Sequence, residues 1–428
     1  MADFRHETLA GGLRLALWST NKFKTNTFRF VLPTKLGVHA AENALVPMVL
    51  RRGTRRYPDT RGLMTRLDDL YGADLRADAY KLGEEQALVF HLSMANDRYL
   101  PGEERILDDG IALLQGVVED PALVDGTLRP DYVAQERENL RRQIESIVND
   151  KAQFAAMRCV EVMAEGTPYA IGRYGRVEDL EPITPRGLTE RYRDLVKGPA
   201  TLYAVGDLEW DTLARAVEDR FLAPHADAPP PPAEPLPPRE GVRRVEERQD
   251  VNQGKLVMGF TTGVAGADPG YPAMVVANGI FGGFAHSKLF LKVREEASLA
   301  YYAYARLDGY KGVCLVSAGL EFENRDRALT IIEEQLMAMQ DGDITEDELD
   351  RTRRGLVNGM RAAEDSPSQS IMRDLELRRM GRDPSLDRRI EAIESVTRDE
   401  AVAAAQRIRL DTVYFLNREG EGVRAAAV

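Results

Sequence analysis

The chain has 428 residues, which is too long for one domain of ordinary size. Hydrophobic residues make up 43% of the sequence and charged residues 29%, so wholesale disorder is excluded. The net charge of −12 argues against a nucleic-acid-binding protein, whose surface is usually basic. We find neither a signal peptide nor an apolar run of about 18 residues, and therefore expect a cytoplasmic protein that does not engage a membrane.

The first half predicts a mixed set of strands and helices. Residues 27–37 alternate between apolar and polar side chains, as a half-buried strand does. A helix is expected next, and then a second helix with a hairpin-like pair of strands. Pro130 and Asp131 open a charged helix, in the first-turn positions where proline and acidic residues are favoured. The expected segments after the first strand are 40–52, 63–94, 128–150 and the helix and strand of 183–208.

A proline tract then interrupts the pattern. Residues 224–238 read PHADAPPPPAEPLPP and show no apolar periodicity. Proline disrupts helix interiors and sheet ladders, so this segment is expected to be a semi-rigid linker. The predicted domains are therefore 1–223 and 239–428.

The second half repeats the order of the first. A strand, a helix, a hairpin-containing segment, a capped helix and a final helix–strand pair follow one another again, which indicates a tandem duplication. We predict an α+β fold made of two tandem homologous α+β units, each with an antiparallel-rich sheet and helices on one face. The repeated segments are 255–263, 271–281, 287–320, 344–365 and 396–417.

Four ordered segments resemble the insulinase/pitrilysin-like zinc metallopeptidases, in the small-subunit form shared with mitochondrial processing peptidase. The most specific is GIFGGFAHSKLFLKVREEASLAYY at 279–302, and the others are LRRGTRRYPD at 50–59, LDDLYGADLRADAY at 67–80 and YAVGDLEWDTL at 203–213. The resemblance covers nearly the whole chain and is strongest to the bacterial subgroup that lacks the zinc motif.

In such enzymes a helix carries His-x-x-Glu-His, whose two histidines bind zinc while the glutamate activates the metal-bound water. The resemblance places these three positions at Ala44, Pro47 and Met48, and the distal glutamate ligand at Gln143. All four residues are unsuited to zinc, so we expect no metal in this chain and no catalytic residue of its own. Zinc would belong to a partner subunit.

One alternative for a metal site lies just upstream, where HAAEN places His39 and Glu42 three residues apart. Asn43 stands where a second histidine would be needed, and an amide is a poor zinc ligand. A loop or an N-terminal helix segment with solvated side chains is the alternative interpretation. The remaining histidines are scattered, and the two cysteines, Cys159 and Cys314, are expected to be reduced and buried.

The resemblance also implies a substrate-binding pair, Arg294 and Tyr301, which would contact the substrate backbone and the carbonyl under attack. A spacing of seven places both on one face only if the segment between them is helical. Ser298 replaces the glycine that is usual in the family. Gly282 and Gly283 correspond to a glycine-rich loop that contacts peptide in the mitochondrial enzyme, although a plain tight turn is an alternative.

These features predict a non-catalytic subunit of a heterodimeric zinc metallopeptidase, inactive by itself. A zinc-bearing paralogue would supply the metal, and this chain would supply Arg294 and Tyr301 for peptides or unfolded segments. Two other functions stay open: a catalytically dead homodimeric scaffold that binds peptides, and an accessory factor for the modification of another protein.

Overall fold

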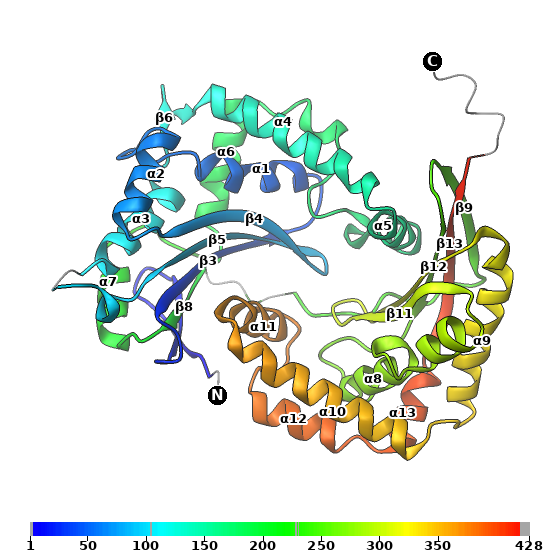
Figure 1. Ribbon diagram of the computed structural model, residues 1–428. Coiled ribbons are helices and arrows are strands. Elements are labelled where there is room, and N and C mark those ends of the chain that lie inside the picture. Colours follow the sequence, from blue (N-terminus) through cyan, green and yellow to red (C-terminus); the bar gives the residue numbers. More distant parts are fainter. Residues whose placement is uncertain (1–2, 103–104, 227–228, 230, 420–428) are drawn as a thin grey trace. The chain divides into compact units, whose positions relative to one another are not determined.

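The structure of the chain is a computed structural model, and it describes residues 3–102, 105–226, 229 and 231–419 (Figure 1). The chain forms two compact units. Unit 1 consists of Met1–Glu145, Ile171–Pro229 and Ser366–Leu375, and unit 2 of Ser146–Ala170, Pro230–Asp365 and Glu376–Val428.

Unit 1 is built on a six-stranded sheet with the order β1-β2-β8-β3-β5-β4. Strand β3, in the middle of the sheet, buries Phe28, Phe30 and Leu32 on one face and Val31 on the other. Only β2 and β8 pair in parallel, and every other pair in this sheet is antiparallel. The strands are β1 (Arg5–Thr8), β2 (Arg14–Ser19), β3 (Thr25–Lys35), β4 (Asp74–Leu82), β5 (Glu85–Ala95) and β8 (Thr201–Gly206), and a separate short hairpin contains β6 (Leu123–Val124) and β7 (Thr127–Leu128).

Two helices of unit 1, α2 and α6, begin at a side chain that caps them. Asp59 accepts a hydrogen bond from the Gly62 amide at the start of α2, and Thr184 does the same for Gly187 at the start of α6. The helices are α1 (Ala40–Leu50), α2 (Thr60–Asp69), α3 (Leu107–Glu119), α4 (Pro130–Ser146), α6 (Pro185–Val196) and α7 (Trp210–Glu218), with short 3₁₀ helices at Asp97–Tyr99 and Glu178–Leu180.

Unit 2 repeats this arrangement with five strands in the order β11-β12-β10-β13-β9. The order matches β4-β5-β3-β8-β2 of unit 1, and the one parallel pair, β13 with β9, corresponds to β8 with β2. The predicted fold of two tandem α+β units is therefore confirmed. The strands are β9 (Arg243–Gln249), β10 (Gly254–Thr261), β11 (Ala300–Asp308), β12 (Val313–Leu320) and β13 (Arg409–Arg418).

Most helices of unit 2 pack on one face of its sheet and form a large apolar core with β10, β11 and β12. Thr345 caps α10 in a capping box with Glu348, in agreement with the capped helix predicted within 344–365. The helices are α5 (Lys151–Met163), α8 (Tyr271–Asn278), α9 (Arg325–Gln340), α10 (Glu346–Ala362), α12 (Leu386–Glu394) and α13 (Arg398–Ala405), with two π-helical segments at Gly279–Gly283 and Phe290–Glu296 and 3₁₀ helices at Ile147–Asn149, Pro168–Ala170, Phe322–Asn324 and Ala363–Asp365.

Each half of the chain contributes a helical segment to the other unit. Helix α5 follows α4 in the first half, yet its Cys159 and Met163 pack on Val257 and Tyr414 of the sheet of unit 2. In the second half, α11 (Pro367–Arg379) follows α10, and its Asp374 accepts a hydrogen bond from Tyr203 on β8 of unit 1. The sequence pattern did not indicate this exchange.

One of the places where the chain passes from unit 1 to unit 2 lies within the proline tract, between Pro229 and Pro230. The described residues of 224–238 form neither helix nor strand, while 227–228 and 230 lie outside the described residues. Whether 1–223 and 239–428 act as separate domains stays a prediction. Both cysteines are free and buried, and burial raises the pKa of the Cys314 thiol to about 12.

Candidate functional site

Helix α1 carries the positions that the zinc motif would occupy, and it is part of the core. Every residue of this helix except Glu42 is buried, including Ala44 and Met48, and Pro47 lies within the helix. The sequence of α1, AAENALVPMVL, explains the burial because it is almost entirely apolar. This arrangement has no nitrogen or carboxylate donor at Ala44, Pro47 or Met48, so these positions do not fit a zinc ion.

Gln143 on α4, the position of the distal ligand, has a structural role instead. Its side-chain amide donates a hydrogen bond to the Tyr174 hydroxyl at 2.6 Å, and that hydroxyl contacts Asp78 Oδ1 on β4 at 3.1 Å. Burial, and next the negative charge of the Asp78 carboxylate, raise the pKa of Tyr174 to about 12. Gln143 thus links α4 to the first sheet.

The upstream HAAEN segment forms the start of α1. His39 is the residue that precedes the helix, and its Nδ1 lies 2.5 Å from Glu42 Oε2 in an exposed pair. Asn43 is buried, donates to Gln86 and accepts from Arg191. Across the described residues no cluster of three or more His, Cys, Asp or Glu side chains could hold a metal ion. The segment is thus the start of a helix, as one interpretation of the sequence had it, but Asn43 is buried and not solvated.

A buried carboxylate near helix α1 has hydrogen-bond partners within the protein for both of its oxygens. Glu136 on α4 is 1% exposed and pairs with the Arg52 guanidinium at 2.5 Å. Asn139 donates to its second oxygen. Because both oxygens are engaged, Glu136 serves as an anchor between α4 and the segment after α1.

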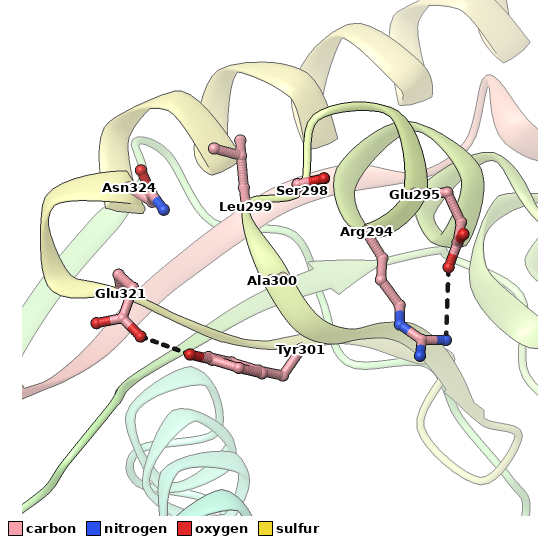
Figure 2. Close-up of a pocket in the computed structure, with 8 residues that line it drawn as sticks. All are labelled: Arg294, Glu295, Ser298, Leu299, Ala300, Tyr301, Glu321 and Asn324. Atoms are coloured by element: carbon pink, nitrogen blue, oxygen red, sulfur yellow. Dashed lines mark hydrogen bonds and ion pairs between the residues drawn. The ribbon is translucent and has the colours of Figure 1, made fainter.

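In the second half, Arg294 and Tyr301 line one cavity of about 360 Å³, and both side chains are exposed (Figure 2). Arg294 is 42% and Tyr301 58% accessible to solvent. The structure thus brings together the two residues that the resemblance paired. The other lining residues are Glu295, Ser298, Leu299, Ala300, Glu321 and Asn324.

Arg294 and Tyr301 lie in two different backbone elements and not on one continuous helix. Arg294 lies in the π-helical segment Phe290–Glu296, which ends before Tyr301, so the two residues do not share a helix face. Ser298 has φ +51°, a left-handed conformation that turns the chain toward β11. The chain takes this turn without the family's usual glycine, and the strain falls on Ser298.

A β-bulge then sets the direction of Tyr301. Ala300 is opposite Leu320 on β12, and Tyr302 is opposite Gly319, so Tyr301 is the extra residue between two consecutive partners. A bulged residue leaves the regular alternation of the strand and can be re-aimed. Tyr301 reaches the cavity for this reason, and no sequence pattern marks the bulge.

Two carboxylates set the electrostatics of the cavity. The Tyr301 hydroxyl donates to Glu321 Oε1 at 2.7 Å, and this hydrogen bond raises the pKa of the Tyr301 phenol (Figure 2). Arg294 lies 3.8 Å from Glu295 Oε1, and its guanidinium carbon is 4.6 Å from the centre of the Phe290 ring. The sequence interpretation missed Glu321, although this residue directly follows the strand that pairs with β11.

Gly282 and Gly283 form the end of the π-helical segment Gly279–Gly283 instead of a plain tight turn. Gly282 is buried, and a Cβ on it would lie 2.5 Å from the Ala305 amide nitrogen of β11. Gly283 is exposed and its nearest obstacle would be 3.5 Å away. Neither glycine lines the cavity of Arg294 and Tyr301, so their role in substrate binding stays a prediction.

Comparison with known proteins finds a matching family model and a similar bacterial protein. Residues 196–356 match the family model described as the peptidase M16 inactive domain. A Bacillus subtilis protein, probable inactive metalloprotease YmfF, is 35% identical over 425 residues, which cover 95% of this chain and 96% of the relative.

Solved structures show the same fold. A conserved protein from Enterococcus faecalis V583 is 27% identical with a TM-score of 0.90, covering 98% of this chain and 99% of the other. A peptidase M16 inactive domain from Pseudomonas fluorescens is 18% identical with a TM-score of 0.78, again over 98% of this chain and 99% of the other. In the part of the chain that the structure describes, no helix is both long and apolar enough to span a membrane.

Proposed function

This chain belongs to the peptidase M16 family, as an inactive metalloprotease-like member, and we propose that it is the non-catalytic, substrate-binding subunit of a heterodimeric zinc peptidase. A zinc-bearing paralogue would supply His-x-x-Glu-His and its distal glutamate. This chain would supply Arg294 and Tyr301. The proposed substrates are peptides or unfolded protein segments.

One observation carries this proposal: the two halves of the chain differ in what they leave accessible. The zinc-motif positions Ala44 and Met48 are apolar and buried, which removes any means of activating water. Arg294 and Tyr301, in contrast, extend exposed hydrogen-bond donors into one cavity. A chain of this kind can bind a substrate backbone and depends on another chain for the hydrolytic step.

The chemistry of the two donors suits a carbonyl under attack. A guanidinium presents several N–H groups in a planar fork, and a phenol presents one O–H. Negative charge that develops on a carbonyl oxygen is stabilised by donors already held in place. In the free chain Glu321 accepts a hydrogen bond from the Tyr301 hydroxyl. A substrate carbonyl would therefore compete with Glu321 for this hydroxyl.

The test combines the full chain with its zinc-bearing paralogue and measures hydrolysis of an unstructured peptide. Arg294→Ala should lower kcat by a factor on the order of 10²–10³, because its hydrogen bonds strengthen as charge develops. Assembly, measured by size-exclusion chromatography, should not change. Arg186→Ala is the matched control, since Arg186 is also exposed and paired with a neighbouring glutamate, Glu190.

Tyr301 gives a second, independent measure. Tyr301→Phe should lower kcat because the donor is lost, and Tyr301→Ala should lower it further if the ring also packs against substrate. If Arg294→Ala and Tyr301→Phe both assemble and keep full activity, the pair is structural and the proposal is wrong. If no mixture hydrolyses peptide while the chain alone forms a stable peptide-binding homodimer, the scaffold function replaces it.

A further inference from the structure

Another cavity of unit 2 lies between helix α10 and the residues that follow the first π-helical segment. Its volume is about 640 Å³, and it shares no lining residue with the cavity of Arg294 and Tyr301. Residues 284–286 form one wall. The other wall is a single face of α10, because its residues recur at helical spacings of three and four. They are Asp347, Arg351, Arg354, Gly355 and Asn358. We call this cavity the α10 pocket, and its size is typical of ligand sites, which measure about 300–1,000 Å³.

The apolar part of the α10 pocket consists of two ordered rings. Phe284 packs against the helix at Gly355, where a Cβ would lie 2.8 Å from the ring. The His286 ring is nearly parallel to the Phe284 ring, with centroids 5.1 Å apart and an angle of 8° between the planes. His286 Nε2 lies 3.1 Å from the hydroxyl of Thr352, a buried residue of α10. Because both rings are already held in place, an aromatic ligand can stack on them with little loss of entropy.

One positive charge in the α10 pocket has no counter-charge. The Asp347 carboxylate accepts from Arg351 Nε at 2.9 Å, so these two charges cancel. Arg354 is exposed, and among the described residues its side chain makes a single polar contact, from Nε to the Asp350 carbonyl at 3.2 Å. Burial, and next the positive charge of Arg351, lower the pKa of His286, so this ring is neutral at pH 7. The terminal N–H groups of Arg354 are therefore available to one anionic group.

A third feature is the side-chain amide of Asn358. It lies one helical turn after Arg354 on the same face, is exposed, and makes no hydrogen bond within the described chain. Arg354 in turn directly precedes Gly355, against which the Phe284 ring packs. The pocket thus brings together an aromatic surface, a cation and an amide. A matching ligand carries an aromatic ring, a carboxylate and a peptide group close to one another, and in the last residue of a polypeptide all three are attached to one Cα.

We propose that the α10 pocket binds the free C-terminus of a polypeptide whose last residue is aromatic. The terminal ring stacks on Phe284 and His286, the carboxylate pairs with Arg354, and the last peptide group bonds to Asn358. A guanidinium suits a carboxylate because two of its N–H groups can bind the two oxygens side by side. This inference goes beyond the proposed function, since the site is separate from the substrate-binding pair and does not depend on hydrolysis.

The first experiment measures binding to the full chain by fluorescence anisotropy. The probe is the peptide Gly-Ser-Gly-Ser-Ala-Phe with a label on its N-terminus and a free C-terminal carboxylate. Amidation of the C-terminus should weaken binding about fivefold because the ion pair is lost. Replacement of the last residue by Ala should weaken it about tenfold, and extension beyond Phe by Gly-Ser should do so as well. Equal binding of the acid and the amide, or of the Phe and Ala peptides, would overturn the inference.

Variants of the chain then assign the contacts. Arg354→Gln should weaken the free acid about fivefold, to the level of the amide, and leave the amide unchanged. The matched control is Arg61→Gln on α2, because Arg61 is also exposed and has no ion pair within the described chain. It should keep the full difference between acid and amide. His286→Ala should weaken both peptides by the same factor, about threefold to fivefold. A preference for the acid that persists in Arg354→Gln would mean that another group binds the carboxylate and that the assignment is wrong.

Competition by small acids tests whether the ligand is the end of a peptide chain. N-acetyl-phenylalanine has the ring, the carboxylate and one peptide group, whereas 3-phenylpropanoate lacks the peptide group. N-acetyl-phenylalanine should displace the labelled peptide at a concentration about threefold lower than 3-phenylpropanoate, because only the former bonds to Asn358. Asn358→Ala should abolish this difference. Equal competition by the two acids in the unmodified chain would show a site for small aromatic acids and would overturn the assignment to a polypeptide end.

Discussion

Helix α1 in the first half and the segment from Phe290 to Tyr301 in the second half are the two regions to which the resemblance assigned the zinc motif and the substrate-binding pair. They differ in their exposure to solvent. All residues of α1 except Glu42 are buried. Arg294 and Tyr301 are 42% and 58% exposed, and both line a cavity. Side chains in the first region therefore contribute to stability, and those in the second are available to a ligand.

The largest effect should come from returning histidines to α1. In the variant Ala44→His/Met48→His, two imidazoles would enter a filled core without hydrogen-bond partners. Overpacking and burial of polar groups should together lower the free energy of unfolding by about 3 kcal/mol or more. Urea unfolding measures this loss, and added zinc should not reverse it.

Two controls sharpen the comparison between the regions. Val38→His changes a side chain that is 87% exposed and should alter stability by less than about 0.5 kcal/mol. Arg294→Ala should be similarly neutral in the isolated chain, since its single ion pair is exposed. Zinc-dependent stabilisation of the double variant would contradict the conclusion that α1 is only a packing element.

Gly282 and Gly283 differ in the same way within the second region, because Gly282 is buried and Gly283 is exposed. Gly282→Ala would place a Cβ 2.5 Å from the Ala305 backbone nitrogen and should lower the free energy of unfolding by about 1–3 kcal/mol. Gly283→Ala meets its nearest atom at 3.5 Å and should change stability by less than about 0.5 kcal/mol. Thermal unfolding of the two variants measures this difference. Equal losses of stability would contradict the conclusion that only Gly282 is needed for packing.

Acid should destabilise unit 1 through His91 on β5. Burial, and next the positive charge of Arg29, lower the pKa of His91 to about 4 from its ordinary value of 6.5. The unfolded chain then binds the proton first, so stability falls as the pH drops from about 6.5 to about 4. After allowance for solvent screening, His91→Gln should reduce this loss by about 1–2 kcal/mol, measured by urea unfolding at each pH.

The exposed histidine of the same unit is the control for this titration. His39→Gln removes an imidazole whose side chain is 56% exposed, and it is the matched histidine substitution to be measured in parallel. A profile for His91→Gln that is indistinguishable from the unmodified chain would mean that His91 does not resist protonation in the folded state.

The smallest expected effect is at the turn before Tyr301. Ser298 has φ +51°, which a residue with a side chain adopts at a cost and glycine adopts freely. Ser298→Gly should raise the free energy of unfolding by about 0.5 kcal/mol, since relief of strain exceeds the entropy that glycine adds to the unfolded chain. Ser298→Ala should bring no gain. A stabilised Ser298→Ala would show that strain at this residue is unimportant.

Several elements could be predicted because their causes are local. The alternation of 27–37 and 255–263 corresponds to β3 and β10, and the acidic start after Thr345 corresponds to a capping box on α10. The repeated order of elements was enough to predict two homologous units. The condition for a shared helical face of Arg294 and Tyr301, a continuous helix between them, is not met, because the helix ends at Glu296.

The sequence by itself determined the duplicated architecture, since periodicity is a property of the residues, and the family resemblance placed residues unsuited to zinc at the motif positions. The tertiary structure alone decided how Tyr301 reaches its cavity, because a bulge arises from the register of β11 against β12. It also decided the pairing of Tyr301 with Glu321 and the exchange of α5 and α11. These features depend on contacts between residues far apart in the chain, which no local pattern encodes.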